Sequence, residues 1–126
     1  MVDLGAKMKP KEIKKLQSRS RKMRVRLVAP NTLVVTSTSN PYAHHIVTIE
    51  MLPEGTIMAR CTCPWAQNGG YGCSHVMAAL NYLAQRQKRV ISFWETEDEA
   101  QRQKHRVLRL TGLGRDGDIF ITSRPA

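Results

Sequence analysis

Residues 61–75 of this chain read CTCPWAQNGGYGCSH and contain all three cysteines of the sequence. The cysteines and the histidine that follows them have the spacing C-x-C, nine residues, then C-x-H. Three thiolates and one imidazole suit the tetrahedral preference of Zn²⁺ and leave no coordination position open for water or substrate. The stretch therefore predicts one structural zinc ion per chain, with the ligands Cys61, Cys63, Cys73 and His75.

The predicted ligands lie at the ends of two regular elements. Residues 56–63 alternate in polarity and predict a strand, on which cysteines two positions apart point to the same side. Pro64 ends this strand. A helix is then predicted from Ser74, because apolar residues recur at helical spacing at Val76, Ala79, Leu80 and Leu83. The start of this helix favours the thiolate form of Cys73.

The preceding residues predict further strands of a small antiparallel sheet in an α+β fold. Residues 23–38 contain two β-rich runs around Pro30 and Asn31, a pair that suits the turn of a hairpin. Residues 42–51 alternate and predict a third strand, with His45 on its more apolar face. We therefore expect four strands before the helix. We interpret His44 and His45 as surface or core residues rather than ligands, although His45, on the apolar face, could lie near the metal.

A further helix and hairpin are predicted toward the C-terminus. Residues 91–94 are expected to connect to a helix that begins at Thr96, because Glu99 completes a capping box. Its basic end is predicted to complement the helix dipole through Arg102, Lys104 and Arg106. Residues 107–110 and 118–122 predict a closing hairpin. The G-x-G-x-x-G pattern at 112–117 predicts a turn, since no helix for a dinucleotide follows it.

The composition favours a polyanionic partner. The 126 residues include 20 Lys and Arg against 10 Asp and Glu, which gives a formal net charge of +10. Nucleic acid is the leading candidate for such a chain.

No apolar run approaches the ~20 residues of a membrane span, and the cysteine spacing suits a metal better than disulfides. We expect a cytoplasmic protein, or a nucleoid or nuclear one when bound to DNA, with no membrane partner.

Most of the excess charge lies at the N-terminus. Residues 1–26 contain ten basic residues against two acidic ones. Residues 1–22 are predicted to be a basic arm or short helix, whose apolar stripe of Ile13 and Leu16 is too thin to dock strongly. The arm could bind phosphates through counterion release, or serve solubility alone. A single domain is expected over 23–126, with the zinc module at 42–84 and a helix and hairpin extension at 91–123.

Candidate nucleic-acid contacts come from the arm, the first strands, the metal loop and the end of the first predicted helix. Trp65 could stack on an unpaired base or pack against the small core. The basic residues after Leu83 could meet phosphates or satisfy the helix dipole. The candidates are Lys11, Lys14, Lys15, Arg19, Arg21, Lys22, Arg24, Arg26, Arg60, Trp65, Arg86, Lys88 and Arg89.

Residues 42–83 resemble the SWIM-type zinc finger family. The resemblance rests on the C-x-C and C-x-H order, on the proline after the second cysteine and on the apolar helix directly after the histidine. It implies a β-β-α zinc-binding fold with the four ligands given above, in a module described as binding nucleic acid or protein. Ser74 stands where the family often has lysine, and no ATPase, transposase or kinase motif accompanies the finger.

These observations predict a small protein that binds nucleic acid, DNA more than RNA, through basic surfaces around a structural zinc. The alternative is an adaptor that holds a protein partner through the finger and sheet. A third interpretation, with Cys73 as a nucleophile and His75, His44 or His45 as base, fits three clustered cysteines poorly. We therefore expect no enzymatic activity and no small-molecule substrate, and we interpret His105 as a surface or core residue.

Overall fold

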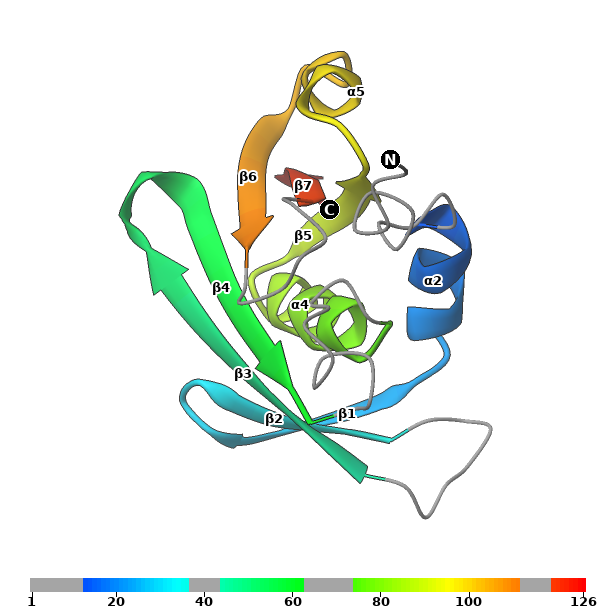
Figure 1. Cartoon of the computed structure of the whole chain (residues 1–126), viewed down its shortest axis with the longest axis vertical. Coiled ribbons are helices and arrows are strands. Elements are labelled where there is room, and N and C mark those ends of the chain that lie inside the picture. The colour runs from blue at the N-terminus through cyan, green and yellow to red at the C-terminus, as the bar shows by residue number, and fades with distance from the viewer. Residues whose placement is uncertain (1–12, 37–43, 63–73, 112–118) are drawn as a thin grey trace, which may run out of the picture.

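In the described part of the chain, seven strands form a single sheet in the order β1-β2-β3-β4-β6-β7-β5 (Figure 1). The computed structural model describes residues 13–36, 44–62, 74–111 and 119–126. The predicted α+β class is confirmed in this part of the chain. Its elements are α2 (Ile13–Ser20), β1 (Arg24–Ala29), β2 (Thr32–Thr36), β3 (His44–Leu52), the 3-10 turn η1 (Pro53–Gly55), β4 (Thr56–Cys61), α4 (Ser74–Arg86), β5 (Arg89–Trp94), α5 (Glu97–Gln101), β6 (Arg106–Thr111) and β7 (Ile119–Pro125).

The first four strands follow the prediction closely. β1 pairs with β2, β2 with β3 and β3 with β4, all antiparallel. The first hairpin turns at Pro30 and Asn31, as their turn chemistry predicts. Along β3 the inward residues Val47 and Ile49 are buried while their neighbours are exposed. The alternation in the sequence therefore identified the face of this strand correctly.

The second half of the sheet corrects the predicted antiparallel arrangement in two respects. Residues 91–94, expected to be a connection, belong to strand β5, which pairs with β7 and buries Ile91 and Phe93. Strand β6 pairs with β7 as the predicted hairpin requires, but its other neighbour is β4, in parallel. The parallel pair joins the two halves into one mixed sheet, which the local sequence pattern could not indicate. The glycine-rich segment 112–117 lies outside the described residues.

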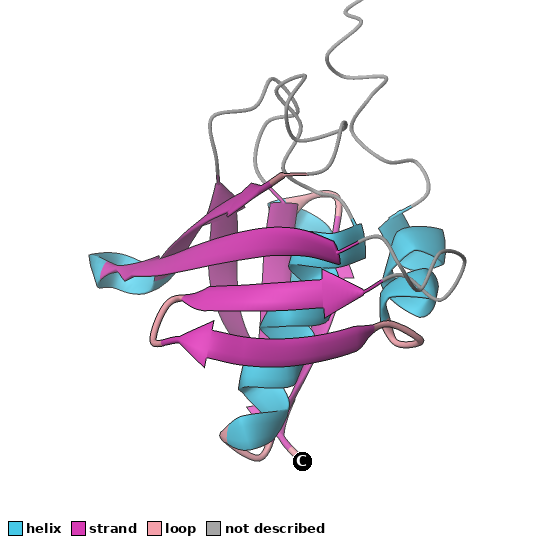
Figure 2. Cartoon of the chain, turned by 90° about the horizontal axis from the view of Figure 1, so that it is seen from below, coloured by secondary structure: helices cyan, strands magenta, loops and turns pink. Residues whose placement is uncertain are grey.

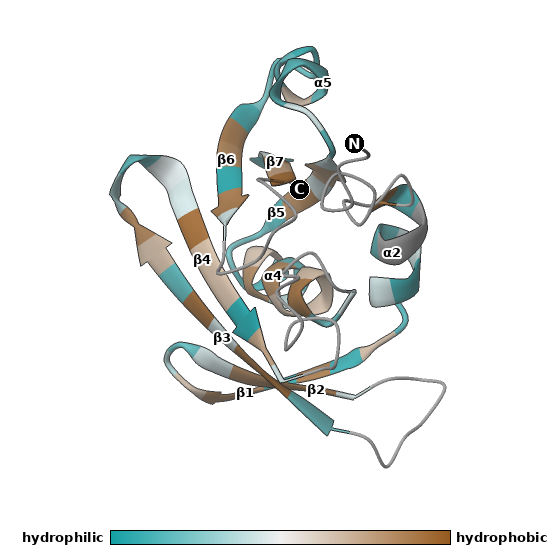
Figure 3. Cartoon of the chain, viewed as in Figure 1, coloured by the Kyte–Doolittle hydropathy of each residue, from teal (hydrophilic) through white to brown (hydrophobic). Residues whose placement is uncertain are grey.

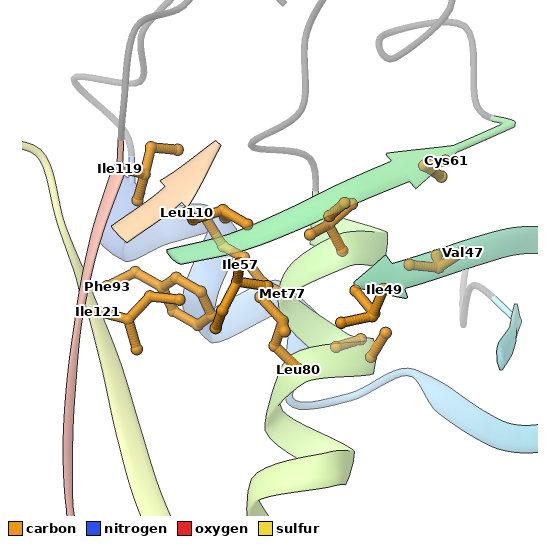
Figure 4. Packing of buried hydrophobic residues seen from close by; sticks show 14 of the residues in the cluster. Val47, Ile49, Ile57, Cys61, Met77, Leu80, Phe93, Leu110, Ile119 and Ile121 are labelled. Carbon is orange, nitrogen blue, oxygen red and sulfur yellow. The ribbon is translucent and has the colours of Figure 1, made fainter. Parts of the chain in front are cut away.

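The sheet curls around helix α4, which forms the centre of the core (Figure 1). The helix contacts strands from both halves of the sheet. In Figure 4, Met77 and Leu80 of α4 lie beside Ile57 of β4 and Phe93 of β5. Figure 3 shows the contrast with α5, which is mainly hydrophilic and lies at the periphery. The strands β1 to β5 therefore share their packing against α4.

Helix α2 is docked on this core. Of the two alternatives predicted for the N-terminal segment, an arm or a short helix, residues 13–20 form the helix. Ile13 is only 5% exposed and belongs to the hydrophobic core. Gln17 is also buried, and its Oε1 accepts a hydrogen bond of 2.9 Å from the backbone N–H of Phe93. Strand β5 lies at the edge of the sheet, and α2 covers it through this bond. The apolar stripe of this helix was expected to be too thin to dock strongly. The buried hydrogen bond of Gln17 adds to the contact that Ile13 makes with the core.

The second predicted helix forms, but it is shorter than predicted. Thr96 precedes α5, and its Oγ1 accepts a hydrogen bond of 3.2 Å from the Glu99 N–H, as a capping box predicts. The helix ends at Gln101, so Lys104 and Arg106 lie beyond its last turn. The prediction that these two residues complement its dipole is therefore wrong. None of the described helices is long and apolar enough to cross a membrane.

Replacing Gln17 with alanine should destabilise the protein by ~1–3 kcal/mol, because the buried N–H of Phe93 would lose its acceptor. Urea unfolding followed by circular dichroism measures this change. Ser18→Ala on the exposed side of the same helix is the control and should change stability by less than about 0.5 kcal/mol. Equal midpoints for Gln17→Ala and the wild type would show that α2 does not stabilise the edge of the sheet.

Candidate metal centre

The end of strand β4 and the start of helix α4 lie against the same part of the core. Cys61 is the last residue of β4, is 8% exposed and pairs with Val47 of β3. The ladder continues one residue further, because the Thr62 N–H donates to the Ile46 carbonyl at 3.2 Å and the Ile46 N–H donates to Thr62 Oγ1 at 3.0 Å. The strand is thus held firmly up to the point where the predicted metal loop begins.

His75, the second residue of α4, has a buried ring nitrogen. Its Nδ1 is buried and has no hydrogen-bond partner among the residues that the structure describes. A buried polar atom without a partner costs ~1–3 kcal/mol, and native proteins rarely leave one without a reason. A neutral imidazole nitrogen is a ligand that Zn²⁺ prefers. The chemistry of His75 therefore fits the predicted metal.

His45 lies directly beside His75. The centroids of the two rings are 4.0 Å apart, and the ring planes are tilted by 35°. His45 is on the inner side of β3, the side that also presents Val47 and Ile49. This contact with one predicted ligand supports the alternative in which His45 lies near the metal site. The contact restricts the orientation of the His75 ring.

The other two predicted ligands, Cys63 and Cys73, lie outside the described residues. Within the described ranges, no three His, Cys, Asp or Glu side chains gather where they could hold a metal ion. Cys61 and His75 contribute only two of the four predicted ligands, so the complete set remains a prediction. The loop tryptophan, Trp65, also lies outside the described residues.

Three of the predicted nucleic-acid contacts lie on the outer face of the sheet, opposite α4. Arg24 and Arg26 are exposed residues of β1, and they alternate with half-buried residues that face inward. Arg60 is an exposed residue of β4 and pairs with Thr48 of β3. Figure 2 looks onto the outer face of β1, β2 and β3, with the central helix behind them. We call the surface of Arg24, Arg26 and Arg60 the cationic sheet face.

Two other candidates make internal contacts. The Lys14 Nζ lies 3.5 Å from the centroid of the Trp94 ring. Burial lowers the pKa of Lys14, the charge of Arg21 lowers it further, and Glu99 opposes the shift. The Arg89 Nε and Nη2 groups donate to Ser123, at 2.6 Å to Oγ and 3.1 Å to the carbonyl oxygen. Both cations contribute to the structure of the chain itself.

The remaining candidates are dispersed. Arg19, Arg21 and Lys22 are exposed at the end of α2 and in the turn that follows it. Arg86 and Lys88 are exposed at the end of α4, at the start of the link to β5. Lys15 belongs to α2, and Lys11 lies outside the described residues.

The sequence reasoning missed two functional features of this region. It did not mark Gln17 as the residue that holds α2 on the sheet, because an isolated polar residue in a basic helix has no distinctive pattern. It also missed that the Arg89 guanidinium is fixed against Ser123, since the two residues are 34 positions apart.

The comparison with family models found one match, over residues 45–84. These residues match the family model described as the SWIM zinc finger, which confirms the resemblance seen in the sequence. The match spans β3 from His45, β4 and most of α4, and it includes all four predicted ligands. The comparisons with curated proteins and with solved structures returned no match.

Purified without chelator, the protein should contain one zinc ion per chain, and a strong chelator should unfold the finger. The expected loss is large because zinc binding in small modules contributes ~10–16 kcal/mol and is coupled to folding. Elemental analysis and circular dichroism before and after chelation measure both effects.

The matched variants are His75→Ala and His105→Ala, which remove one imidazole each. His105 is exposed and far along the chain from the ligands. His75→Ala should lower the zinc content and the thermal midpoint, whereas His105→Ala should retain both. Protein that stays zinc-free and folded would contradict the assignment.

Proposed function

We propose that this chain binds nucleic acid, DNA in preference to RNA, through its cationic sheet face, while a structural zinc ion holds the underlying finger together. The observation that carries the proposal is the position of Arg24, Arg26 and Arg60 on the one open face of β1 to β4, in a chain of net charge +10. The zinc and the cations have separate roles in this account.

The zinc part of the proposal assigns a β-β-α finger to β3, β4 and α4. Cys61 and Cys63 would approach the ion from the end of β4, and Cys73 and His75 from the start of α4. The SWIM match over these elements supports this assignment. So does the buried Nδ1 of His75, which lacks a partner within the described residues. The bound ion would supply a cross-link and no reaction, because four protein ligands close its coordination sphere.

The binding part rests on the difference between the two faces of the sheet. The inner face of β1 to β4 packs on α4 and forms part of the core, so it does not offer an extended surface to a nucleic acid. The outer face carries three exposed arginines and one described acidic residue, Glu50. Arginine donates up to five hydrogen bonds from a planar group and suits phosphate oxygens. Such contacts would position a nucleic acid backbone across the strands.

A protein partner is the second candidate for the same region. Ile46 is 48% exposed and lies on the outer face between the arginines of β1 and β4. An apolar residue among cations also suits an acidic protein surface. Capture of one protein that persists after nuclease treatment would favour this alternative. For either partner we propose binding without catalysis and without a membrane or small-molecule substrate.

The affinity for DNA should fall steeply with salt, and the slope should depend on the cationic sheet face. The variant Arg24→Gln, Arg26→Gln, Arg60→Gln should reduce the slope of log K against log salt by up to about three, because each phosphate contact contributes ~0.7–0.9. Fluorescence anisotropy with single-stranded DNA, duplex DNA and RNA at several salt concentrations measures the slope for each target.

The control removes the same charge elsewhere, with Arg102→Gln, Lys104→Gln and Arg106→Gln, and should retain most of the slope. Equal slopes for the two triple variants would show that net charge alone is responsible. Binding that does not depend on salt would sink the proposal.

Deletion of residues 1–22 is unsuitable as a test of the arm, because it removes Ile13 and Gln17 from the core. Substitution of the exposed Arg19, Arg21 and Lys22 avoids this problem.

A further inference from the structure

A separate pocket of about 230 Å³ opens between the β3–β4 hairpin, the second half of α4 and the strands β5 to β7. It lies away from the cationic sheet face, on the inner side of the sheet. Its wall is largely aliphatic and includes Ile49, Met51, Ile57, Leu80, Leu83 and Ile91. Most of these residues are buried, so the floor of the pocket is part of the core.

The edge of the pocket is formed by an unusually exposed residue. Met51 is 62% exposed, although it follows Val47 and Ile49 on the inner side of β3. Methionine is flexible and polarizable, and it adapts to different apolar partners. An exposed methionine in the wall of a pocket is thus typical of a contact surface. Ile46, on the same strand, faces the opposite side of the sheet.

Among the described residues that line the pocket, Arg89 is the only charged one and none is acidic. Its Nε and Nη2 are held by Ser123, and its Nη1 has no hydrogen-bond partner among the described residues. The guanidinium of Arg89 is therefore fixed in place, and its Nη1 can still donate hydrogen bonds to a ligand. The exposed Arg86 and Lys88 precede it in the chain and add positive charge nearby.

We propose that this pocket binds a protein partner through a segment in which one large aliphatic side chain stands next to a carboxylate. The aliphatic side chain would fill the apolar floor, and the carboxylate would accept hydrogen bonds from Arg89. A volume of about 230 Å³ is below the ~300–1,000 Å³ of pockets for drug-sized ligands, but it suits a single anchor side chain. This site is independent of the proposed nucleic-acid surface.

Charge argues for a foreign partner over the chain itself. A second copy would carry the same net charge of +10 and would be repelled. Val2, Asp3 and Leu4 of this chain have the required chemistry, but three lysines follow them within the next seven residues. Those lysines would have to approach the cations beside the pocket.

The test is a nuclear magnetic resonance titration of the full chain with the peptide Gly-Asp-Leu-Asp-Gly and two matched peptides. In one the aspartates become asparagines, and in the other the leucine becomes serine. The acidic aliphatic peptide should shift the amide signals of Leu83, Ala84 and Ile91 and bind at least about tenfold more tightly than either control. Equal binding of the three peptides, or shifts confined to β1 and β2, would overturn the proposal.

Two variants of strand β3 provide the matched protein control. Met51→Glu places a like charge and a polar group at the pocket and should weaken binding about tenfold or more, while Ile46→Glu should not. Equal losses would show a general charge effect and refute the site. A chain without residues 1–6 should bind the peptide as the full chain does. A gain of about tenfold would identify the N-terminal segment as the occupant instead.

Discussion

The burial of helix α4 inside a curled sheet is the constraint on which the rest of this structure depends. Ser74 and the residues from Val76 to Leu80 are all buried, so the first turns of the helix have almost no contact with solvent. Polar atoms there must find partners within the protein. The Nδ1 of His75 finds none among the described residues. A zinc ion shared with the end of β4 would resolve this conflict and tie the helix to the sheet at the same point.

This arrangement assigns different roles to the two sides of the sheet. The inner side of β1 to β4 packs on α4 and forms part of the core, except where the pocket beside Met51 remains open. The outer side of β1 to β4 is open and carries three arginines. A polyanion and an acidic aliphatic segment would therefore bind on opposite sides of the same strands, and neither would compete with the other.

Local patterns were sufficient to predict the first four strands, the start of α4 and the cap of α5. Each of these depends on neighbouring residues: turn residues at Pro30 and Asn31, alternation along β3, and the side chain of Thr96. The parallel pairing of β4 with β6 and the pairing of β5 with β7 depend on residues far apart in the chain. A short apolar run such as 91–94 therefore looked like a connection until its partner strand was known.

At the candidate site, too, features that depend on neighbouring residues were predictable, and features that depend on distant residues were not. The inward face of His45 was predictable from alternation, and its contact with His75 agrees with that prediction. The docking of α2 was not predictable, because it combines the burial of Ile13 with a hydrogen bond between Gln17 and Phe93, two residues 76 positions apart. The spacing of the cysteines remains the best indicator of the ligand set, and the SWIM match over 45–84 supports the same region.

X-ray absorption spectroscopy at the zinc edge, on protein purified without chelator, tests the central claim most directly. The account predicts a four-coordinate ion with three sulfur atoms at ~2.3 Å and one imidazole nitrogen at ~2.0–2.1 Å. The imidazole signal should disappear in His75→Ala. A first shell dominated by oxygen, or an imidazole signal that persists in this variant, would show that the metal does not join β4 to α4.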